Sequence, residues 1–583
     1  MGEGKGDSES SAVPAAAGIR LKLNPTFLSA AAVSVLLIVS FFLWTLPFRH
    51  NELPFGEGDS AWHFAIGDHI SSSDRATFRL PYYIGVWYYG FNKILGPFAP
   101  EYPPSSHVNY ALMQIVGGER FVPVFIYRAI ASFLGALAVF FVVSRLFGVL
   151  PAFIAALGLS FSLREQLTYL FGQQPTLTAI IITPVAAYAW YKYLTSFYLK
   201  GDNGSSSSKE GGDKIYIFIT FALLASQYLL HLQGFVASAV VIAVMTVLFV
   251  LRFRKIPLAR ASAASFAVAI LLFAVVAAPF ASIYLGAGDV VSRSGLGRLF
   301  EWGISPADVQ GSFPPSFVQF LAEYPKLLLP FLLAGLTLLL LRLFLVKNNA
   351  RELFLLSWLI GAYLATHLDV FVPTGLNRLA RMLVLENYIF YTLIALTVVW
   401  LPATLSSLLK FNARFVSAAK YSLAVLLIIS LIMSSGKATY SNLSQAYSGI
   451  DRITPAQADF AANYISKLPE DAYVFDPSIK IVGQWRYPKL RWMLAISQRF
   501  VGRYDGGPVA DADHLNKDEV YFLFDYSDIA LFASSPQYKE QAAAWASQLN
   551  QLELAMFNGT QPLYDANNIR LYKYSGKPVE AVE

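Results

Sequence analysis

Two ionisable residues near the start of the chain have the spacing of a catalytic pair. Asp59 and His63 are four residues apart, so a helix would place both side chains on one face. A carboxylate in that position can bind a divalent metal or act as a base toward an acceptor. The alternative is that Asp59 only caps the helix that contains Trp62 and Phe64, which is the usual role of an Asp before an apolar run.

Further along the chain, Glu165 and Arg164 are adjacent ionisable residues at the end of a short apolar run. Charges at the depth of a membrane indicate a functional site. An interfacial ion pair, or an Arg that extends toward the headgroups, would need no function. The residues do not decide between these interpretations. His231 stands beside Gln233 at a later polar turn and is a candidate phosphate ligand, although a lone His there is more often an interfacial residue with its hydrogen bonds satisfied.

Arg378 and Arg381 are three residues apart and would share one face of a helix. Guanidinium groups match the oxygens of a lipid phosphate or pyrophosphate. The alternative is that the two arginines pair with Asp369 or Glu386, and we favour the phosphate.

Another polar segment, 286–326, contains five charged residues: Asp289, Arg293, Arg298, Glu301 and Asp308. Any carboxylate in this segment can extend over a site, and a solvated charged loop is the commoner arrangement for each one taken singly.

Several chemistries have no motif in the chain. There is no Walker loop, Gly-rich dinucleotide fingerprint, G-x-S-x-G elbow or H-E-x-x-H. The absence of cysteine excludes thiol nucleophiles and Cys-ligated metals. The net charge of +6 is modest and spread along the chain, which predicts no nucleic-acid partner.

The elements that must position these residues are predicted to be membrane spans. The 583 residues are 55% hydrophobic and only 14% charged, whereas soluble proteins are about 25% charged. Apolar runs of roughly 20 residues predict spanning helices. About eleven runs qualify: Phe27–Leu46, Phe125–Val143, Val149–Leu163, Thr176–Leu194, Ile215–Leu232, Gly234–Leu251, Ala261–Leu285, Leu327–Leu345, Leu353–His367, Met382–Leu401 and Ser417–Met433.

The basic residues orient these spans. With residues 1–22 as a disordered cytoplasmic N-terminus, eleven crossings place Lys and Arg at every inner loop, as the positive-inside rule expects. The outer side then receives the long or polar loops, 47–121, 164–175, 286–326 and 368–381. Arg378 and Arg381 stand on the side that the rule disfavours, which supports an anionic partner. The candidate chemistry therefore gathers on the outer face.

The transmembrane domain is predicted to extend over 23–435, and residues 436–583 to form an extracytoplasmic α/β domain. Thr454-Pro455-Ala456-Gln457 predicts a capped helix start. Ala472–Phe475 and Val520–Phe524 read as buried strands, Gln537–Leu549 as a helix, and Asn567-Asn568 as a hairpin turn.

This pattern resembles the GT-C superfamily of membrane glycosyltransferases, and within it the catalytic subunits of oligosaccharyltransferases. The resemblance is carried by the first-loop Gly58-Asp59-Ser60, by Ser162-Leu163-Arg164, by Arg378-Leu379-Ala380-Arg381 and by the outer C-terminal domain. It implies that Asp59 and Glu165 hold a divalent metal, Mg²⁺ or Mn²⁺, with Glu301 as the third catalytic carboxylate. It also implies that Arg378 or Arg381 binds the donor phosphate.

Two departures from that pattern are visible. Gln173 and Gln174 stand about where a second acidic motif is expected. The acceptor-reading Trp-Trp-Asp motif is absent, and Gly483-Gln484-Trp485-Arg486-Tyr487 is the nearest aromatic stretch. Transfer to Asn-x-Ser/Thr sequons is therefore one option among several.

The hypothesis is transfer of a sugar or oligosaccharide from a polyprenyl-phosphate-linked or polyprenyl-pyrophosphate-linked donor, within membrane lipid, to a protein or glycan acceptor on the outer face. Two alternatives are a lipid-linked saccharide flippase without covalent chemistry and an accessory membrane subunit. The gathering of polar residues at one face, without an internal repeat, favours the enzyme.

Overall fold

The computed structural model describes most of the chain. The described residues are 24–49, 51–56, 59–73, 81–84, 103–199, 214–257, 260–280, 325–346, 349–367, 379–410, 412–445, 452–503 and 519–574.

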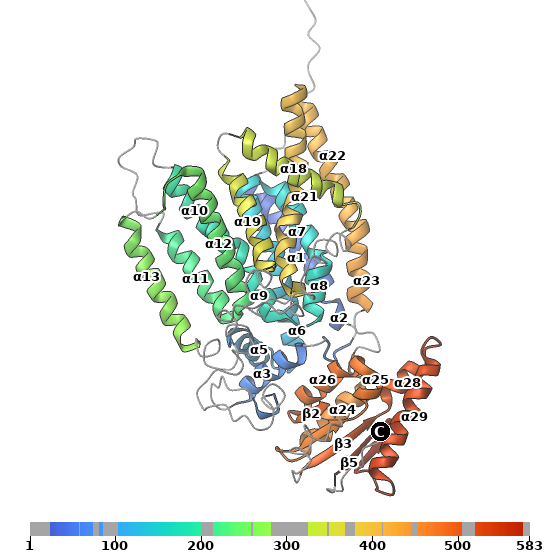
Figure 1. Ribbon diagram of the computed structural model, residues 1–583. Coiled ribbons are helices and arrows are strands. Elements are labelled where there is room, and N and C mark those ends of the chain that lie inside the picture. The colour runs from blue at the N-terminus through green and yellow to red at the C-terminus, as the bar shows by residue number, and fades with distance from the viewer. Residues whose placement is uncertain are drawn as a thin grey trace, which may run out of the picture.

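A bundle of apolar helices forms the larger part of the molecule (Figure 1). Among the described residues, five helical stretches are long and apolar enough to cross a membrane. They are α1 (Pro25–Trp44), α6 (Val122–Phe147), α12 (Leu232–Phe253), residues Val384–Leu409 of α21 (Leu379–Leu409), and the run Ala413–Ser444 that begins with α22 (Ala413–Leu431). The chain is therefore a multi-pass helical membrane protein.

Shorter helices complete the bundle: α7 (Val149–Ser160), α9 (Gln174–Ile181), α10 (Thr183–Leu199), α11 (Ile215–Leu230), α13 (Arg260–Ala277), α18 (Leu329–Leu345) and α19 (Ala350–Thr366). Each of the eleven predicted spans overlaps a helix. The run Thr176–Leu194 is divided between α9 and α10, because Pro184 lacks the N–H that would continue the ladder. The number of eleven crossings therefore stays a prediction.

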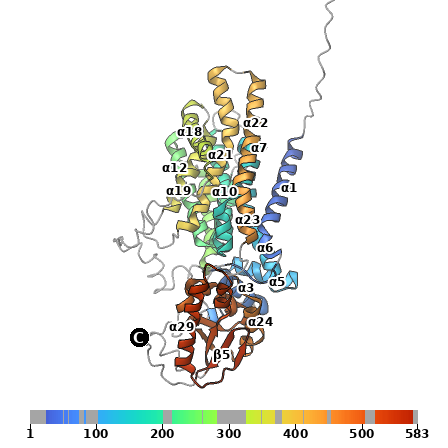
Figure 2. The same cartoon turned by 90° about the vertical axis from the view of Figure 1, so that its right-hand side faces the viewer.

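Four short helices accompany the bundle: α2 (Leu46–Arg49), α3 (Ser60–Ser72), α5 (Ser105–Gly117) and α8 (Leu163–Leu170). Two of them, α3 and α5, lie at its end that faces the C-terminal domain (Figures 1 and 2). α3 packs on α5 and on α26 (Tyr487–Ser497) of the C-terminal domain, whereas α8 packs on α9 and α21. α3 and α5 therefore connect the bundle to the domain.

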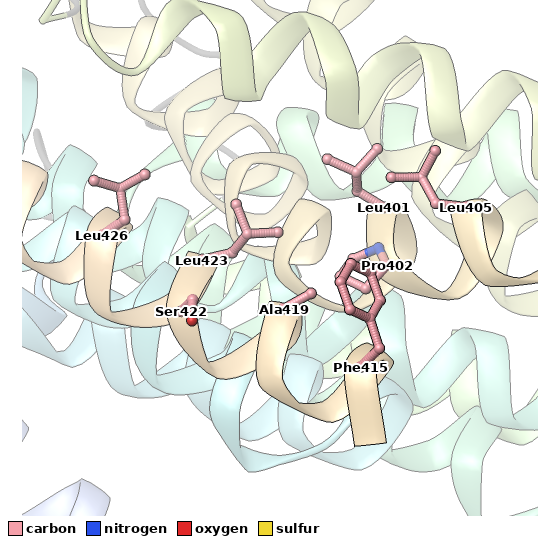
Figure 3. Close-up of a pocket in the computed structure, with 8 residues that line it drawn as sticks. All are labelled: Leu401, Pro402, Leu405, Phe415, Ala419, Ser422, Leu423 and Leu426. Carbon is pink, nitrogen blue, oxygen red and sulfur yellow. The ribbon is translucent and has the colours of Figure 1, made fainter. Parts of the chain in front are cut away.

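The opposite end of the bundle holds an apolar pocket of about 390 Å³ between α21 and α22. Leu401, Pro402 and Leu405 of α21 face Phe415, Ala419 and Leu423 of α22 (Figure 3). The pocket lies near the helix ends that are remote from α8, so it contributes nothing to the position of the candidate residues.

The C-terminal domain is built on a five-stranded sheet in the order β2-β1-β3-β5-β4. β1 (Tyr473–Asp476) runs parallel to β2 (Phe500–Arg503) and β3 (Val520–Asp525), with Val474 opposite both Val501 and Tyr521. β5 (Ile569–Lys573) is antiparallel to β3 and to β4 (Tyr564–Ala566). The remaining helices are α24 (Pro455–Asn463), α25 (Ile479–Val482), α28 (Ser527–Ala533) and α29 (Lys539–Phe557).

The local predictions for this domain are confirmed. The Thr454 hydroxyl accepts from the Gln457 N–H, and the Gln457 side chain accepts from the Thr454 N–H, which is the predicted capping box of α24. Asn567 and Asn568 have φ of 55° and 63°, as a two-residue hairpin turn between β4 and β5 requires.

The connection between bundle and domain is helical. α22 continues through a π-helical turn (Ile432–Gly436) into α23 (Lys437–Gln445). The predicted boundary between 435 and 436 falls inside this helix. The Thr439 hydroxyl on α23 accepts from the Gln166 amide of α8 at 2.5 Å, which joins α23 to α8.

Candidate active site at the junction of the bundle and the C-terminal domain

Asp59 stands immediately before α3, in the position of a helix cap, but its side chain makes no capping hydrogen bond. Its backbone is held instead: the Asp59 N–H donates to the Phe171 carbonyl at 3.3 Å, and the Asp59 carbonyl accepts from the His63 N–H at 3.1 Å. Asp59 therefore stands at the start of the helix without capping it through its carboxylate.

Two glycines bring the chain close to the residue after Asp59. Gly56 and Gly172 have φ of +114° and +74°, and a Cβ at either position would overlap Ser60. Only glycine adopts these angles readily and leaves this space. The Ser60 hydroxyl accepts from the Arg128 guanidinium at 2.9 Å, and Arg128 also donates to the Tyr169 carbonyl at 3.0 Å. The segments around Ser60 and Tyr169 are thus locked together beside Asp59.

His63 is buried and faces His107 of α5, with 3.0 Å between Nδ1 of His63 and Nε2 of His107. Burial lowers the pKa of His107 to about 3, so this imidazole is neutral at pH 7. The contact is to a second histidine, which the four-residue spacing of Asp59 and His63 did not predict.

The C-terminal domain places Arg491 of α26 beside Asp59. The distance between Nη1 of Arg491 and Oδ1 of Asp59 is 4.0 Å. The guanidinium lies over the rings of Tyr487 and Trp62, at 4.2 Å and 5.1 Å from their centroids. Sequence reasoning missed Arg491, because nothing in the local pattern connects α26 with the first loop.

Several hydrogen bonds fix α26 on the first loop. The Trp492 indole donates to the Gly56 carbonyl at 3.0 Å. Arg120 donates to the Ala495 and Ile496 carbonyls, at 2.8 Å and 3.0 Å, and also forms an ion pair with Asp68 at 2.8 Å. A cation at the C-terminal end of a helix stabilises it through the helix dipole. The domain is therefore docked through polar contacts that need a defined orientation.

Glu165 is fully buried on α8. Its Oε2 accepts from the Asn387 amide of α21 at 3.2 Å, and the same amide donates to the Ser162 hydroxyl at 3.0 Å. Its Oε1 is buried without a hydrogen-bond partner in the described part of the chain. Burial raises the pKa of this carboxyl, which lies in the loop between two spans, to about 7 despite the Ser162 and Asn387 hydrogen bonds. Such a group can exchange a proton near neutral pH.

The candidate residues that come last in the sequence lie at or just before the start of α21. Glu386 lies beside His367, with 3.8 Å between Oε1 and Nδ1, and both side chains are buried. Arg381 belongs to α21, but its side chain lies outside the described part of the structure, and so do residues 368–378 with Arg378. Glu301 also lies outside the described residues. Their roles stay predictions.

His231 stands between α11 and α12, where its Nδ1 accepts from the Gln233 N–H at 3.2 Å as the cap of α12. This hydrogen bond satisfies one ring nitrogen, as expected if His231 is an interfacial residue. Its role toward a phosphate stays a prediction.

The aromatic stretch Gly483–Tyr487 leads into α26 and carries a buried cluster of charges. Arg486 contacts three carboxylates at its two terminal nitrogens: Asp476 at 2.7 Å, Asp525 at 2.6 Å and Asp528 at 2.9 Å. Lys489 also pairs with Asp528. Burial by itself would lower the pKa of Arg486, but these carboxylates raise it. The cluster is closed on itself and stabilises the domain.

The comparisons with known proteins concern the fold. No protein-family model matches the chain, and no curated protein matches it in sequence. Archaeal oligosaccharyltransferase AglB from Archaeoglobus fulgidus, in complex with an inhibitory peptide and a dolichol-phosphate, aligns with a TM-score of 0.55 and 15% identity over 94% of this chain and 74% of that one. The oligosaccharyltransferase of the same organism in complex with Zn and sulfate gives 0.52 and 15% over 88% and 70%.

ArnT from Cupriavidus metallidurans in the apo state aligns with a TM-score of 0.51 and 14% identity, over 94% of this chain and 97% of that one. At these identities the likeness establishes the fold alone. The fold that the resemblance implied is therefore confirmed as the fold of these solved proteins.

Proposed function

We propose that this protein transfers a sugar or oligosaccharide from a polyprenyl-phosphate-linked or polyprenyl-pyrophosphate-linked donor to an acceptor on the outer face of the membrane. The observation that carries the proposal is Asp59, a partly exposed carboxylate immediately before α3 that lies 4.0 Å from Arg491, at the junction of bundle and C-terminal domain. The fold is that of an oligosaccharyltransferase solved with a dolichol-phosphate and, in another structure, with an acceptor peptide, which supports a lipid-phosphate donor and a peptide among the acceptors.

In the proposed reaction, the acceptor's nucleophilic atom forms a bond to the anomeric carbon of the donor. The proton that it loses passes to the Asp59 carboxylate, which acts as the base. The bond between the anomeric carbon and the phosphate oxygen breaks, and its electron pair stays on that oxygen. Arg378, Arg381 and His231 are the proposed ligands of the departing phosphate, because cations aimed at the developing charge lower the barrier.

Glu165 and Glu301 are the further proposed catalytic carboxylates. The burial of Glu165 and its hydrogen bond from the Asn387 amide on α21 support this role.

A divalent metal at Asp59 and Glu165 was predicted from the resemblance, and a protein of the same fold has been solved with Zn. The described residues do not fit such a site. No group of three His, Asp or Glu residues in the described part of the chain could hold a metal ion, and the guanidinium of Arg491 lies 4.0 Å from the Asp59 carboxylate, where it would repel a dication. No step above passes through a metal. Activity after exhaustive chelation, with Mg²⁺, Mn²⁺ or Zn²⁺ restored separately, tests the prediction.

The acceptor can be a protein or a glycan. The stretch Gly483–Tyr487 contains no acid, and its Arg486 is turned into the domain core and not toward the first loop. A sequon peptide and a lipid-linked or free glycan are therefore both offered in the assay.

The orientation that we propose has eleven crossings, a cytoplasmic N-terminus and an extracytoplasmic C-terminal domain. The chain contains no cysteine, so single cysteines introduced at Ser8 and at Lys539 report the side of each end without any background. Labelling of Lys539→Cys but not Ser8→Cys by an impermeant maleimide in sealed cells is the expected result. Equal labelling of both would contradict an odd number of crossings.

The function is tested with purified protein in liposomes that contain a polyprenyl-phosphate-linked radiolabelled saccharide. Transfer of label to an added acceptor by the wild type, and none by Asp59→Asn, is expected. Movement of labelled lipid across the bilayer without a transfer product would establish the flippase alternative instead.

A further inference from the structure

We infer that Arg491 of the C-terminal domain is the positioning residue of Asp59, so that activation of the acceptor depends on the docked C-terminal domain. The inference rests on the proposed function, because Arg491 acts through Asp59. It adds a residue from the far end of the chain to a site that the sequence places in the bundle loops.

The guanidinium of Arg491 is fixed from two sides. It lies over Tyr487 of its own helix and over Trp62 of α3, the helix that Asp59 begins. Stacking on aromatic faces restrains a guanidinium that would otherwise sample many rotamers. The side chain is only 14% exposed, and Asp59 is 25% exposed. The two charges are therefore partly withdrawn from water, where their attraction is screened less than at the surface.

The helix that carries Arg491 is itself anchored at both ends. At its start, Arg486 and Lys489 belong to the buried charge cluster with Asp476, Asp525 and Asp528. At its end, the Ala495 and Ile496 carbonyls accept from Arg120. A functional group is held precisely when the groups around it are locked by their own contacts. α26 meets this condition on both sides of Arg491.

The separation of the pair matters for its role. A direct hydrogen bond between a guanidinium and a carboxylate has a length of about 2.7–2.9 Å, whereas Nη1 of Arg491 lies 4.0 Å from Oδ1 of Asp59. At this distance the guanidinium orients the carboxylate by charge and does not close a direct bond on that oxygen. Asp59 can then accept the acceptor's proton, while Arg491 neither gains nor loses one.

The experiment measures transfer by the full-length protein in liposomes, with kcat and the donor KM determined separately. The variants are Arg491→Met, which keeps most of the length and removes the charge, Arg491→Lys, which keeps the charge, and Arg491→Ala with and without added ethylguanidinium. Lys539→Met is the matched control, because Lys539 is an exposed cation of the same domain at the start of α29.

For Arg491→Met we expect kcat to fall about 10- to 100-fold, the cost of a misplaced catalytic group, with the donor KM unchanged within twofold. Arg491→Lys should recover part of the loss. Ethylguanidinium should restore part of the Arg491→Ala activity and none of the Asp59→Asn activity, an effect that a misfolded variant cannot show. Lys539→Met should match the wild type.

Wild-type kcat in Arg491→Met would overturn the inference, and so would a raised donor KM with unchanged kcat, because Arg491 would then bind the donor instead. Absence of rescue in Arg491→Ala together with a lowered unfolding temperature would assign a purely structural role. A wild-type protein that transfers nothing would instead defeat the proposed function.

Discussion

Two arginines at the start of α26 meet carboxylates in opposite ways. Arg486 faces into the C-terminal domain, where it is fully buried and contacts Asp476, Asp525 and Asp528 at 2.6–2.9 Å. Arg491, little more than one helical turn later, faces out of the domain and stands 4.0 Å from Asp59. The same residue type on the same short segment thus forms a closed cluster on one side and an open pair on the other.

The difference indicates which charges stabilise the fold and which are available for a reaction. A buried charge must be matched by close partners, because desolvation is costly. Burial alone would raise the pKa of Asp528, but Arg486 and Lys489 lower it below its usual range. The charges of the Arg486 cluster are held by one another in the core of the domain, whereas the Asp59–Arg491 pair is more exposed and more widely separated.

The largest expected effect is at the open pair. Asp59→Asn should lower transfer at least 100-fold, because a positioned base contributes about 10²- to 10⁴-fold, while thermal unfolding stays as in the wild type. Asp565→Asn, at an exposed carboxylate of the C-terminal domain, should leave transfer unchanged. Transfer in liposomes and unfolding in detergent are the two measurements. Full transfer activity of Asp59→Asn would show that the Asp59–Arg491 pair takes no part in the reaction.

Substitution of Arg486 in the closed cluster should lower the free energy of unfolding. Arg486→Met leaves three buried carboxylates without their partner, and removal of one member of a buried ion pair costs about 3–5 kcal/mol. Lys573→Met, at a lysine that is 46% exposed and pairs with the partly exposed Glu519, should cost at most about 1 kcal/mol. Denaturant unfolding, followed by fluorescence of the C-terminal domain, compares the two. Equal losses of unfolding free energy in the two variants would show that burial does not distinguish the two kinds of ion pair.

A smaller effect is expected at the turn that supports Asp59. Gly172 and Gly559 both have φ of +74°, but a Cβ at Gly172 would overlap Ser60, whereas a Cβ at Gly559 would meet nothing. Both Gly→Ala variants carry the same backbone strain of about 1–2 kcal/mol. Only Gly172→Ala should also displace Asp59 and lower kcat, by about tenfold or more. An equal kcat in the two variants would show that the packing of Gly172 against Ser60 does not affect the candidate site.

The smallest effect is a change in pH dependence. Burial raises the pKa of the Glu165 carboxyl to about 7, so the group is ionised above that pH and protonated below it. If the ionised form is the active one, transfer should rise with pH and reach half its maximum near pH 7. Glu165→Gln should remove this inflection. A profile of the variant that still bends near pH 7 would assign the titration to another group.

Much of the fold could be predicted because its signals are local. Apolar runs marked the helices of the bundle, Thr454 and Gln457 marked the start of α24, and the pair of asparagines marked the last hairpin. Asp59 could be singled out by residue type and by its place before an apolar helix. The split of Thr176–Leu194 into α9 and α10 was missed, because the hydrophobic window is insensitive to one proline.

What the sequence by itself determined is a membrane protein with few charges and a small α/β domain at its end. Only the tertiary structure decided that Arg491 stands beside Asp59, that His63 faces His107, and that Glu165 is held by Asn387. Periodicity and capping act over a few residues, so a single chain shows them directly. Contacts between distant segments depend on how whole elements dock, and no short stretch of sequence carries that information.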